Sequence, residues 1–181
     1  MSRILSTQVG IPCVEFVELD DAVDWCERWV KLHARAGGRP SAYFDIDDTL
    51  LRRDNTKIDP TCRLFDACVR ARVAPFLITA RPSEGYQVTE EQLRSHGLDG
   101  YKRLMMHPPH SRCRTASEAG RAKLAARHRI EGHGYTACLN AGDAPHDHAH
   151  PHASRLFGAI DRDAIYVFVT SDGVAHLKLP G

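Results

Sequence analysis

"AYFDIDDTLL", residues 42–51, joins an apolar segment typical of a buried strand to three nearby carboxylates, Asp45, Asp47 and Asp48. Like charges a few ångströms apart repel, and burial makes each carboxylate harder to ionise. A turn without a chemical task is built more readily from Gly, Asn or Ser. The stretch therefore predicts that a cation lies beside these aspartates.

The rest of the chain alternates between strand-like and helix-like segments. Strands are expected at residues 41–46, 74–79, 102–107 and 134–143. Helices are expected at residues 20–37, after Asp59 as N-cap with Pro60 at the first helical position, at 83–97 with Ser83 as cap, and at 115–130. Residues 164–170 and 174–179 are expected to form a closing hairpin or strand pair. This order predicts an α/β fold, a Rossmann-like three-layer sandwich with a mostly parallel sheet.

The length of 181 residues fits a single domain. Residues 1–40 are expected to be an N-terminal segment with one helix packing on the core, and residues 41–181 to form that core. No apolar run is long enough for a membrane span, and the first residues lack the apolar core of a signal peptide. We therefore expect a cytoplasmic protein without a membrane partner.

The charge balance is close to neutral, with 24 Lys and Arg against 23 Asp and Glu. It gives no general case for nucleic acid as the main partner, although a local basic patch stays open, as does a homo-oligomer. The cysteines have no C-x-x-C spacing, which favours buried free thiols over a zinc site. They are Cys13, Cys26, Cys62, Cys68, Cys113 and Cys138.

Three of the predicted strands end in polar residues, Asp45, Thr79 and Asp143. In an open parallel sheet, ligands bind where the carboxyl ends of the strands meet. These three residues are therefore expected at one edge of the sheet.

Four motifs in one order carry a family resemblance: "DIDDT", Thr79 in "LITARP", Lys123, and "GDAPHD" at residues 142–147. They resemble the motifs of the haloacid dehalogenase (HAD) superfamily of phosphohydrolases. The "ITARP", Lys123 with Arg127, "NAGD" and the closing "LKLP" look like the branch that contains class B acid phosphatases and plant vegetative storage proteins. Residues 50–77 and 80–122 are filled by predicted core elements, so the chain is expected to have no large cap domain.

The resemblance implies a catalytic role for each acidic residue. Asp45 would attack phosphorus and form an aspartyl-phosphate, and Asp47 would act as general acid and then general base. The carboxylates of Asp45 and Asp143 and the backbone carbonyl of Asp47 would bind Mg²⁺, with support from Asp147. Asp48 is expected only to shape the turn.

The resemblance also implies the phosphate-binding residues. Thr79 would hydrogen-bond a phosphoryl oxygen, and Lys123 would neutralise charge shared by that oxygen and Asp45. Lys102 lies in the same interval, but the spacing to Arg127 favours Lys123, which Arg127 would aim. Arg81 would either reach the substrate or brace the loop.

The segment "HDHAHPH" has alternating histidines, His146, His148, His150 and His152. This pattern is compatible with a transition-metal site, but no cysteine or second cluster is spaced to complete one, which favours a solvated polar loop. The sequence leaves both interpretations open.

The function expected from these observations is a Mg²⁺-dependent phosphomonoester hydrolase acting on small organic phosphates such as nucleotides. Two alternatives stay open. One is a phosphatase acting on a macromolecule, either a nucleic-acid end or a phosphoprotein. The other is a weakly active or non-catalytic storage or binding protein, as the resemblance to vegetative storage proteins allows.

Overall fold

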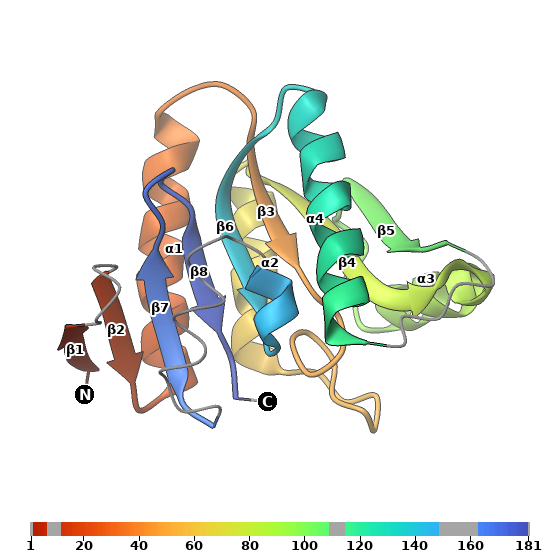
Figure 1. The fold of residues 1–181 in the computed structure, drawn as a ribbon, viewed down its shortest axis with the longest axis horizontal. Coiled ribbons are helices and arrows are strands. Elements are labelled where there is room, and N and C mark those ends of the chain that lie inside the picture. Colours follow the sequence, from red (N-terminus) through yellow and green to blue (C-terminus); the bar gives the residue numbers. More distant parts are fainter. Residues whose placement is uncertain (1, 7–11, 109–114, 149–162, 181) are drawn as a thin grey trace.

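The fold, seen in a computed structural model, is one mixed sheet with helices on both faces (Figure 1). The structure describes residues 2–6, 12–108, 115–148 and 163–180. The strands are β1 (Ser2–Ser6), β2 (Pro12–Phe16), β3 (Pro40–Phe44), β4 (Ala74–Pro82), β5 (Arg103–His107), β6 (Thr136–Gly142), β7 (Ile165–Val169) and β8 (Ala175–Lys178). The helices are α1 (Leu19–Arg35), α2 (Asp59–Arg70), α3 (Tyr86–Ser95) and α4 (Ala116–Gly132), with short 3₁₀ turns η1 (Ser83–Gly85) and η2 (Pro145–His148).

The strand order is β1-β2-β7-β8-β6-β3-β4-β5. The pairs from β8 to β5 are parallel, whereas β1, β2 and β7 add an antiparallel edge. The prediction of a mostly parallel, Rossmann-like α/β fold is confirmed, and β7 and β8 form the predicted antiparallel pair. In this arrangement β3 lies between β4 and β6, so that their carboxyl ends are neighbours.

The central strands are buried on both faces, and the side chains alternate between them. Phe44 and Leu77 belong to the larger core, which also includes side chains of α1, α2 and α3. Tyr43, Phe76 and Ile78 face the other way and pack on Ala126 and Ile130 of α4. In Figure 1, α4 accordingly lies on the face of the sheet opposite to α1 and α2.

The first forty residues contribute more than the expected helix. Besides α1, they form β1 and β2, and β2 pairs with β7, so the segment extends the same sheet. Both strands have only five residues, and β1 is the edge strand of the sheet. Such short strands give a weak β-propensity signal, and neither is predicted from the sequence.

Two other elements differ in detail from the prediction. The strand β4 continues to Pro82, which pairs with His107, so α3 begins at Tyr86 after the turn η1 and is not capped by Ser83. The N-cap of α2 is Ile58, and Asp59 is the first helical residue. Thr115 caps α4 by accepting a hydrogen bond from the backbone N–H of Glu118.

Five of the six cysteines lie in the described residues, and all five are buried and free, as expected. Cys113 lies outside the described residues. Within those same parts of the chain, no helix combines the length and apolar character needed to cross a bilayer.

The centre of the sheet gives the first prediction. Leu77 is fully buried between β3 and β5, so Leu77→Ala is expected to lower the free energy of unfolding by about 2–5 kcal/mol. Val88, on the exposed side of α3, is the matched control, and Val88→Ala should change the free energy of unfolding by less than about 0.5 kcal/mol. Urea unfolding followed by circular dichroism measures both, and equal effects would contradict the packing described.

Candidate active site

Two neighbouring parallel strands end in carboxylates that share one site. Asp45 follows β3 and Asp143 follows β6, and the backbone N–H of Asp45 donates to the carbonyl of Ala141 at 3.1 Å. The chain then turns sharply, and Asp48 adopts the left-handed conformation with φ 53° while its N–H bonds to the carbonyl of Leu51. An Asp tolerates this conformation better than most residues, which fits the turn-shaping role expected for Asp48.

The side chain of Lys123 reaches this site from α4. Its Nζ donates to Oδ1 of Asp45 at 2.7 Å and to Oδ1 of Asp147. The side chains of all three residues are almost completely buried, so the ammonium group of Lys123 contacts carboxylates where it would otherwise contact water. The structure thus brings Asp45, Lys123, Asp143 and Asp147 into one cluster.

Asp147 is held in place from several sides. Its Oδ2 accepts the backbone N–H of Ala144 at 3.0 Å, and its backbone carbonyl accepts hydrogen bonds from Arg127 and Asn140. Gly142 leaves the space for this arrangement, because an added Cβ there would overlap the Asp147 side chain. Arg127 therefore fixes the backbone beside the lysine and does not pair with a carboxylate through a hydrogen bond.

The charges in the cluster are unequal. Although burial opposes both charged forms, the attraction between Lys123 and its carboxylates raises the pKa of Lys123 and lowers that of Asp147. Burial, followed by repulsion from Asp147, raises the pKa of Asp45 to about 8 and that of Asp143 to about 7. One lysine therefore does not balance the buried carboxylates of Asp45 and Asp147 together with the partly buried one of Asp143, and the cluster favours a further cation.

The donor set fits a hard divalent cation. Carboxylate oxygens of Asp45, Asp143 and Asp147 lie within 4.8 Å of one another. In the described part of the chain, these three residues form a group that could hold a metal ion. Mg²⁺ binds through few carboxylates and keeps several waters, so three convergent oxygens suit it. The residues present therefore fit the Mg²⁺ expected from the sequence.

Asp47 points to a different partner from the other acids. Its Oδ1 accepts hydrogen bonds from Nη2 of Arg81 at 2.6 Å and from Nε at 3.2 Å, and Nε also contacts Oδ2 at 3.0 Å. Arg81 is itself held by Thr89 and Gln92 of α3. The guanidinium thus contacts the loop that carries Asp47, as a brace would, and the other role expected for Arg81, contact with substrate, stays a prediction.

Thr79 and Lys102 occupy different ends of the sheet. Thr79 is buried near the carboxyl end of β4, where its Oγ1 accepts the backbone N–H of Arg81 at 3.2 Å. No hydrogen bond joins Thr79 to Asp45 or Lys123 in the residues described. Lys102 precedes β5 and donates its N–H to Pro75, near the start of β4. Only Lys123, of the two candidate lysines, reaches the carboxylates.

The histidines of the predicted polar loop divide between the site and the core. His146 places Nε2 3.7 Å from Oδ1 of Asp147, and His148 is fully buried. The ring nitrogens of His148 lie 3.1 Å from the carbonyl of Gly142 and 3.2 Å from Nδ1 of His176. Burial lowers the pKa of His148 to about 4, so it is a neutral core residue at neutral pH. His150 and His152 lie outside the described residues.

Three buried residues of this network were not predicted: Asn140, His148 and His176. Asn140 donates to the carbonyl of Asp147 at 2.7 Å and lies 3.3 Å from Nδ1 of His176. A polar residue inside the apolar run "ACLNAG" was the available signal for Asn140. No comparable signal distinguished His148 from its neighbours in the alternating pattern, or His176 within β8.

Comparison with known proteins agrees with this geometry. The family model described as HAD superfamily, subfamily IIIB (Acid phosphatase), matches residues 52–161, more than half of the chain. The match includes Thr79, Arg81, Lys123, Asp143 and Asp147, and it begins after Asp45 and Asp47. A search of the curated proteins finds no match.

The close approach at β6 gives a test of the cluster. Gly142→Ala should displace Asp147 and lower both Mg²⁺ affinity and hydrolytic activity by at least about tenfold, because overpacking shifts the carboxylate. Gly132→Ala is the control, since its Cβ would enter open space. Calorimetric titration with Mg²⁺ and an activity assay compare the two variants, and unchanged Mg²⁺ binding in Gly142→Ala would exclude Asp147 from the metal site.

The raised pKa values predict how Mg²⁺ stabilisation depends on pH. Between about pH 4 and pH 8 the metal-free folded state retains protons on Asp45 and Asp143 that the unfolded state has released. The contribution of these two acids to the free energy of unfolding therefore falls as pH rises. A divalent cation bound between these carboxylates would take the place of those protons. The increase in melting temperature on adding Mg²⁺ should therefore be larger at about pH 8 than at about pH 5.

The quantity to compare is the rise in melting temperature that Mg²⁺ causes at each pH, and not the melting temperature itself. The lowered pKa of His148 makes the stability of the folded state rise with pH over part of this range, which is opposite to the effect of Asp45 and Asp143. Thermal unfolding with Mg²⁺ and with EDTA at each pH measures this Mg²⁺-induced increment. An increment independent of pH, or larger in acid, would contradict the assignment.

Proposed function

Because the chain belongs to the acid phosphatase subfamily IIIB of the HAD superfamily, we propose that it is a Mg²⁺-dependent phosphomonoester hydrolase working through an aspartyl-phosphate. The reaction is the hydrolysis of R–O–PO₃²⁻ by water to R–OH and inorganic phosphate. Asp45, Asp47, Thr79 and Lys123 are the proposed catalytic residues, and Asp45, Asp47, Asp143 and Asp147 the proposed metal-binding residues.

The proposal rests above all on the contact of Lys123 with Asp45 inside a group of three carboxylates, of which Asp45 and Asp147 are buried and Asp143 is partly buried. A purely structural ion pair would be neutral, with one carboxylate for one ammonium. Here two acids beyond the Lys123–Asp147 pair have raised pKa values, so they retain protons at pH values where ordinary carboxylates are ionised, and a cation could replace those protons. Such perturbation by burial and specific neighbours is typical of functional sites.

Asp45 is the proposed nucleophile. Its 2.7 Å contact with Lys123 orients one carboxylate oxygen, and the ammonium offsets negative charge when an anionic phosphoryl group approaches. The carboxylate displaces the alkoxide and forms an acyl phosphate, which water then hydrolyses, so one difficult displacement becomes two easier ones. Thr79 supplies a hydroxyl for a phosphoryl oxygen at the neighbouring strand end.

Asp47 is the proposed general acid and base. It lies two residues from Asp45, and its carboxylate is half-exposed, with 47% of the side chain accessible. It would give a proton to the leaving alkoxide and later take one from the attacking water. Arg81 holds the Asp47 loop before substrate arrives, and as a cation beside the site it is also within the proposed substrate-binding set.

When bound, Mg²⁺ would supply electrostatic neutralisation of the phosphoryl oxygens. Asp45 and Asp143 would hold it with their carboxylates and Asp47 with its backbone carbonyl, and Asp147 would support it from the turn η2. Small organic phosphates such as nucleotides are compatible with a site that has no separate cap domain, and the cytoplasm is the proposed location.

Two substitutions test the division of labour. Asp45→Asn should lower hydrolysis of p-nitrophenyl phosphate by at least about 10³-fold, because the nucleophile is lost. Asp47→Asn should lower kcat by about 10²–10⁴-fold while leaving Mg²⁺ binding largely intact, because its metal contact is through the backbone.

Asp48→Asn is the matched control, since Asn tolerates the same left-handed backbone and the acid makes an exposed contact with Arg53. Activity and Mg²⁺ titrations on all three variants separate the roles. Full activity in Asp45→Asn would remove the nucleophile assignment, and loss of Mg²⁺ binding in Asp47→Asn would contradict its role as acid and base.

A further inference from the structure

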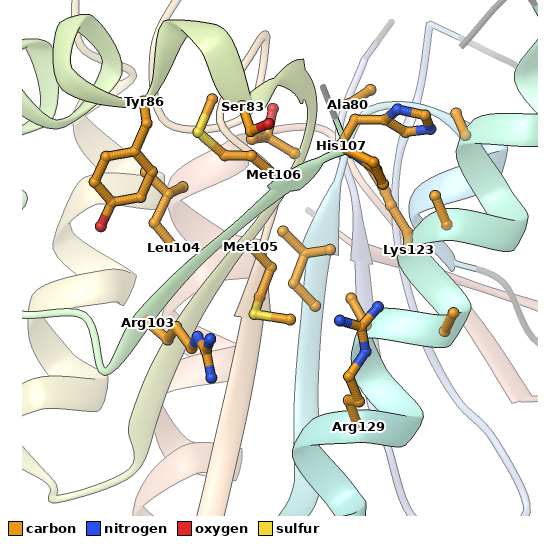
Figure 2. Close-up of a pocket in the computed structure, with 17 residues that line it drawn as sticks. Ala80, Ser83, Tyr86, Arg103, Leu104, Met105, Met106, His107, Lys123 and Arg129 are labelled. Atoms are coloured by element: carbon orange, nitrogen blue, oxygen red, sulfur yellow. The ribbon is translucent and has the colours of Figure 1, made fainter. Parts of the chain in front are cut away.

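A groove leads away from the catalytic cluster along α4. It consists of two adjoining cavities of about 470 and 650 Å³ whose walls share Arg103, Met105 and Arg129. Thr79 and Lys123 belong to the wall of the first cavity, at its catalytic end. Figure 2 shows Arg103 on β5 and Arg129 on α4 on either side of Met105.

The charged side chains in the walls of this groove are all basic. Neither cavity is lined by an Asp or Glu in the described part of the chain, although the whole chain has 23 acids for 24 Lys and Arg. The basic residues are Arg39, Lys102, Arg103, His107, Lys123, Arg129 and His133. Although the net charge of the chain is close to zero, positively charged side chains are therefore concentrated beside the site.

One arginine on the opposite face of the sheet behaves differently. Arg63, on α2, contacts the carboxylates of Asp20, Asp24 and Glu27. Lys102, Arg103 and Arg129 make no ion pair with a carboxylate of the described residues. An exposed cluster of uncompensated cations raises the local concentration of anions and favours a ligand with several negative charges.

The far end of the groove adds an aromatic surface. Tyr135 packs edge-on against Phe76 with ring centroids 4.9 Å apart, and the guanidinium of Arg39 lies 4.0 Å from the centroid of the Tyr135 ring. Arg39 is fixed there by donating to the carbonyl of His133 at 2.8 Å. Cations interleaved with aromatic and Met side chains suit stacked bases joined by phosphates.

The length of the groove also exceeds what one phosphate requires. Lys123 marks its catalytic end and His133 its far end, and this stretch of helix advances about 15 Å. A small phosphomonoester would occupy only the first cavity. Contacts with successive phosphates would use the whole groove.

We propose that this groove binds a short single-stranded nucleic-acid end whose terminal phosphomonoester enters the Asp45 site. The proposal rests on the proposed function and specifies its substrate class. An acidic phosphopeptide would use the cations but would leave the Tyr135–Arg39 surface without a partner. The terminal phosphate is released as inorganic phosphate and the oligonucleotide keeps a hydroxyl, with water as the only co-reactant.

The central experiment compares substrates in a charge-reversal variant. Arg103→Glu combined with Arg129→Glu should lower kcat/KM for a six-residue oligothymidylate that carries a 5′- or 3′-terminal phosphate. The loss should come from a higher KM and not from a lower kcat. That loss should exceed the loss for p-nitrophenyl phosphate by at least about tenfold. Arg28→Glu combined with Arg70→Glu changes net charge equally on exposed positions of α1 and α2, and should show no such difference.

Binding provides a second readout that needs no catalysis. Fluorescence anisotropy of a labelled, unphosphorylated oligothymidylate should show salt-dependent binding to the wild-type protein and to Asp45→Asn. Tyr135→Leu removes the aromatic surface without changing charge, and should weaken this binding by about five- to tenfold. Thermal melts establish that each variant is folded.

Several results would overturn the groove assignment. They are equal losses for both substrates, no binding of the oligothymidylate, or stronger binding of an acidic phosphopeptide that is insensitive to Tyr135→Leu. If p-nitrophenyl phosphate is still hydrolysed in an Asp45-dependent manner, these results leave the proposed function standing. Failure to hydrolyse any phosphomonoester, with oligothymidylate binding retained, would instead reject the proposed function and leave only the binding surface.

Discussion

The contact of the Lys123 ammonium with Asp45 and Asp147 is the interaction on which the rest of the site depends. Placing two buried carboxylates and a partly buried third side by side is costly unless positive charge is supplied. Lys123 and Asp147 satisfy one another, whereas Asp45 and Asp143 keep raised pKa values of about 8 and about 7. Two protons on these acids are electrically equivalent to one divalent cation. This balance explains why the cluster favours a divalent cation.

The fold places these charges by simple geometry. Parallel pairing of β3 with β6 brings Asp45 and Asp143 to the same edge. Side chains alternate along β3, so Asp45 lies on the same face as Tyr43, the face covered by α4. Lys123 can therefore reach Asp45 from the first half of α4. The antiparallel edge made by β1, β2 and β7 lies on the other side of β8 and adds core without altering the site.

The sequence predicted the convergence of strand ends because that follows from the alternation of strands and helices. It also favoured Lys123 over Lys102, and the structure explains the difference, since Lys102 lies near the opposite end of the sheet. The partner of Arg81 was not predictable, because nothing in "TARP" fixes whether a long, flexible side chain turns toward the substrate or toward Asp47. His148 was missed for another reason: alternating histidines resemble a polar loop, and burial of one of them depends on tertiary contacts with β6 and β8.

The same limits apply to the substrate. Total charge argued against a nucleic-acid partner, but it carries no information about where Arg103 and Arg129 lie. Only the packing of α4 beside β5 places those cations in one groove that begins at Thr79 and Lys123. The residues that the structure describes form no separate cap domain over the site, and the proposed groove would offer additional contacts to a substrate.

The central claim is that Asp45 becomes phosphorylated during turnover. Rapid acid quenching during hydrolysis of p-nitrophenyl phosphate, followed by peptide mass spectrometry, tests it most directly. The predicted result is a phosphoryl group on the peptide that contains Asp45, acid-stable and lost on brief treatment with hydroxylamine. Continued turnover with phosphate on another residue, or with no phosphorylated peptide under conditions that trap a known aspartyl-phosphate, would contradict the claim.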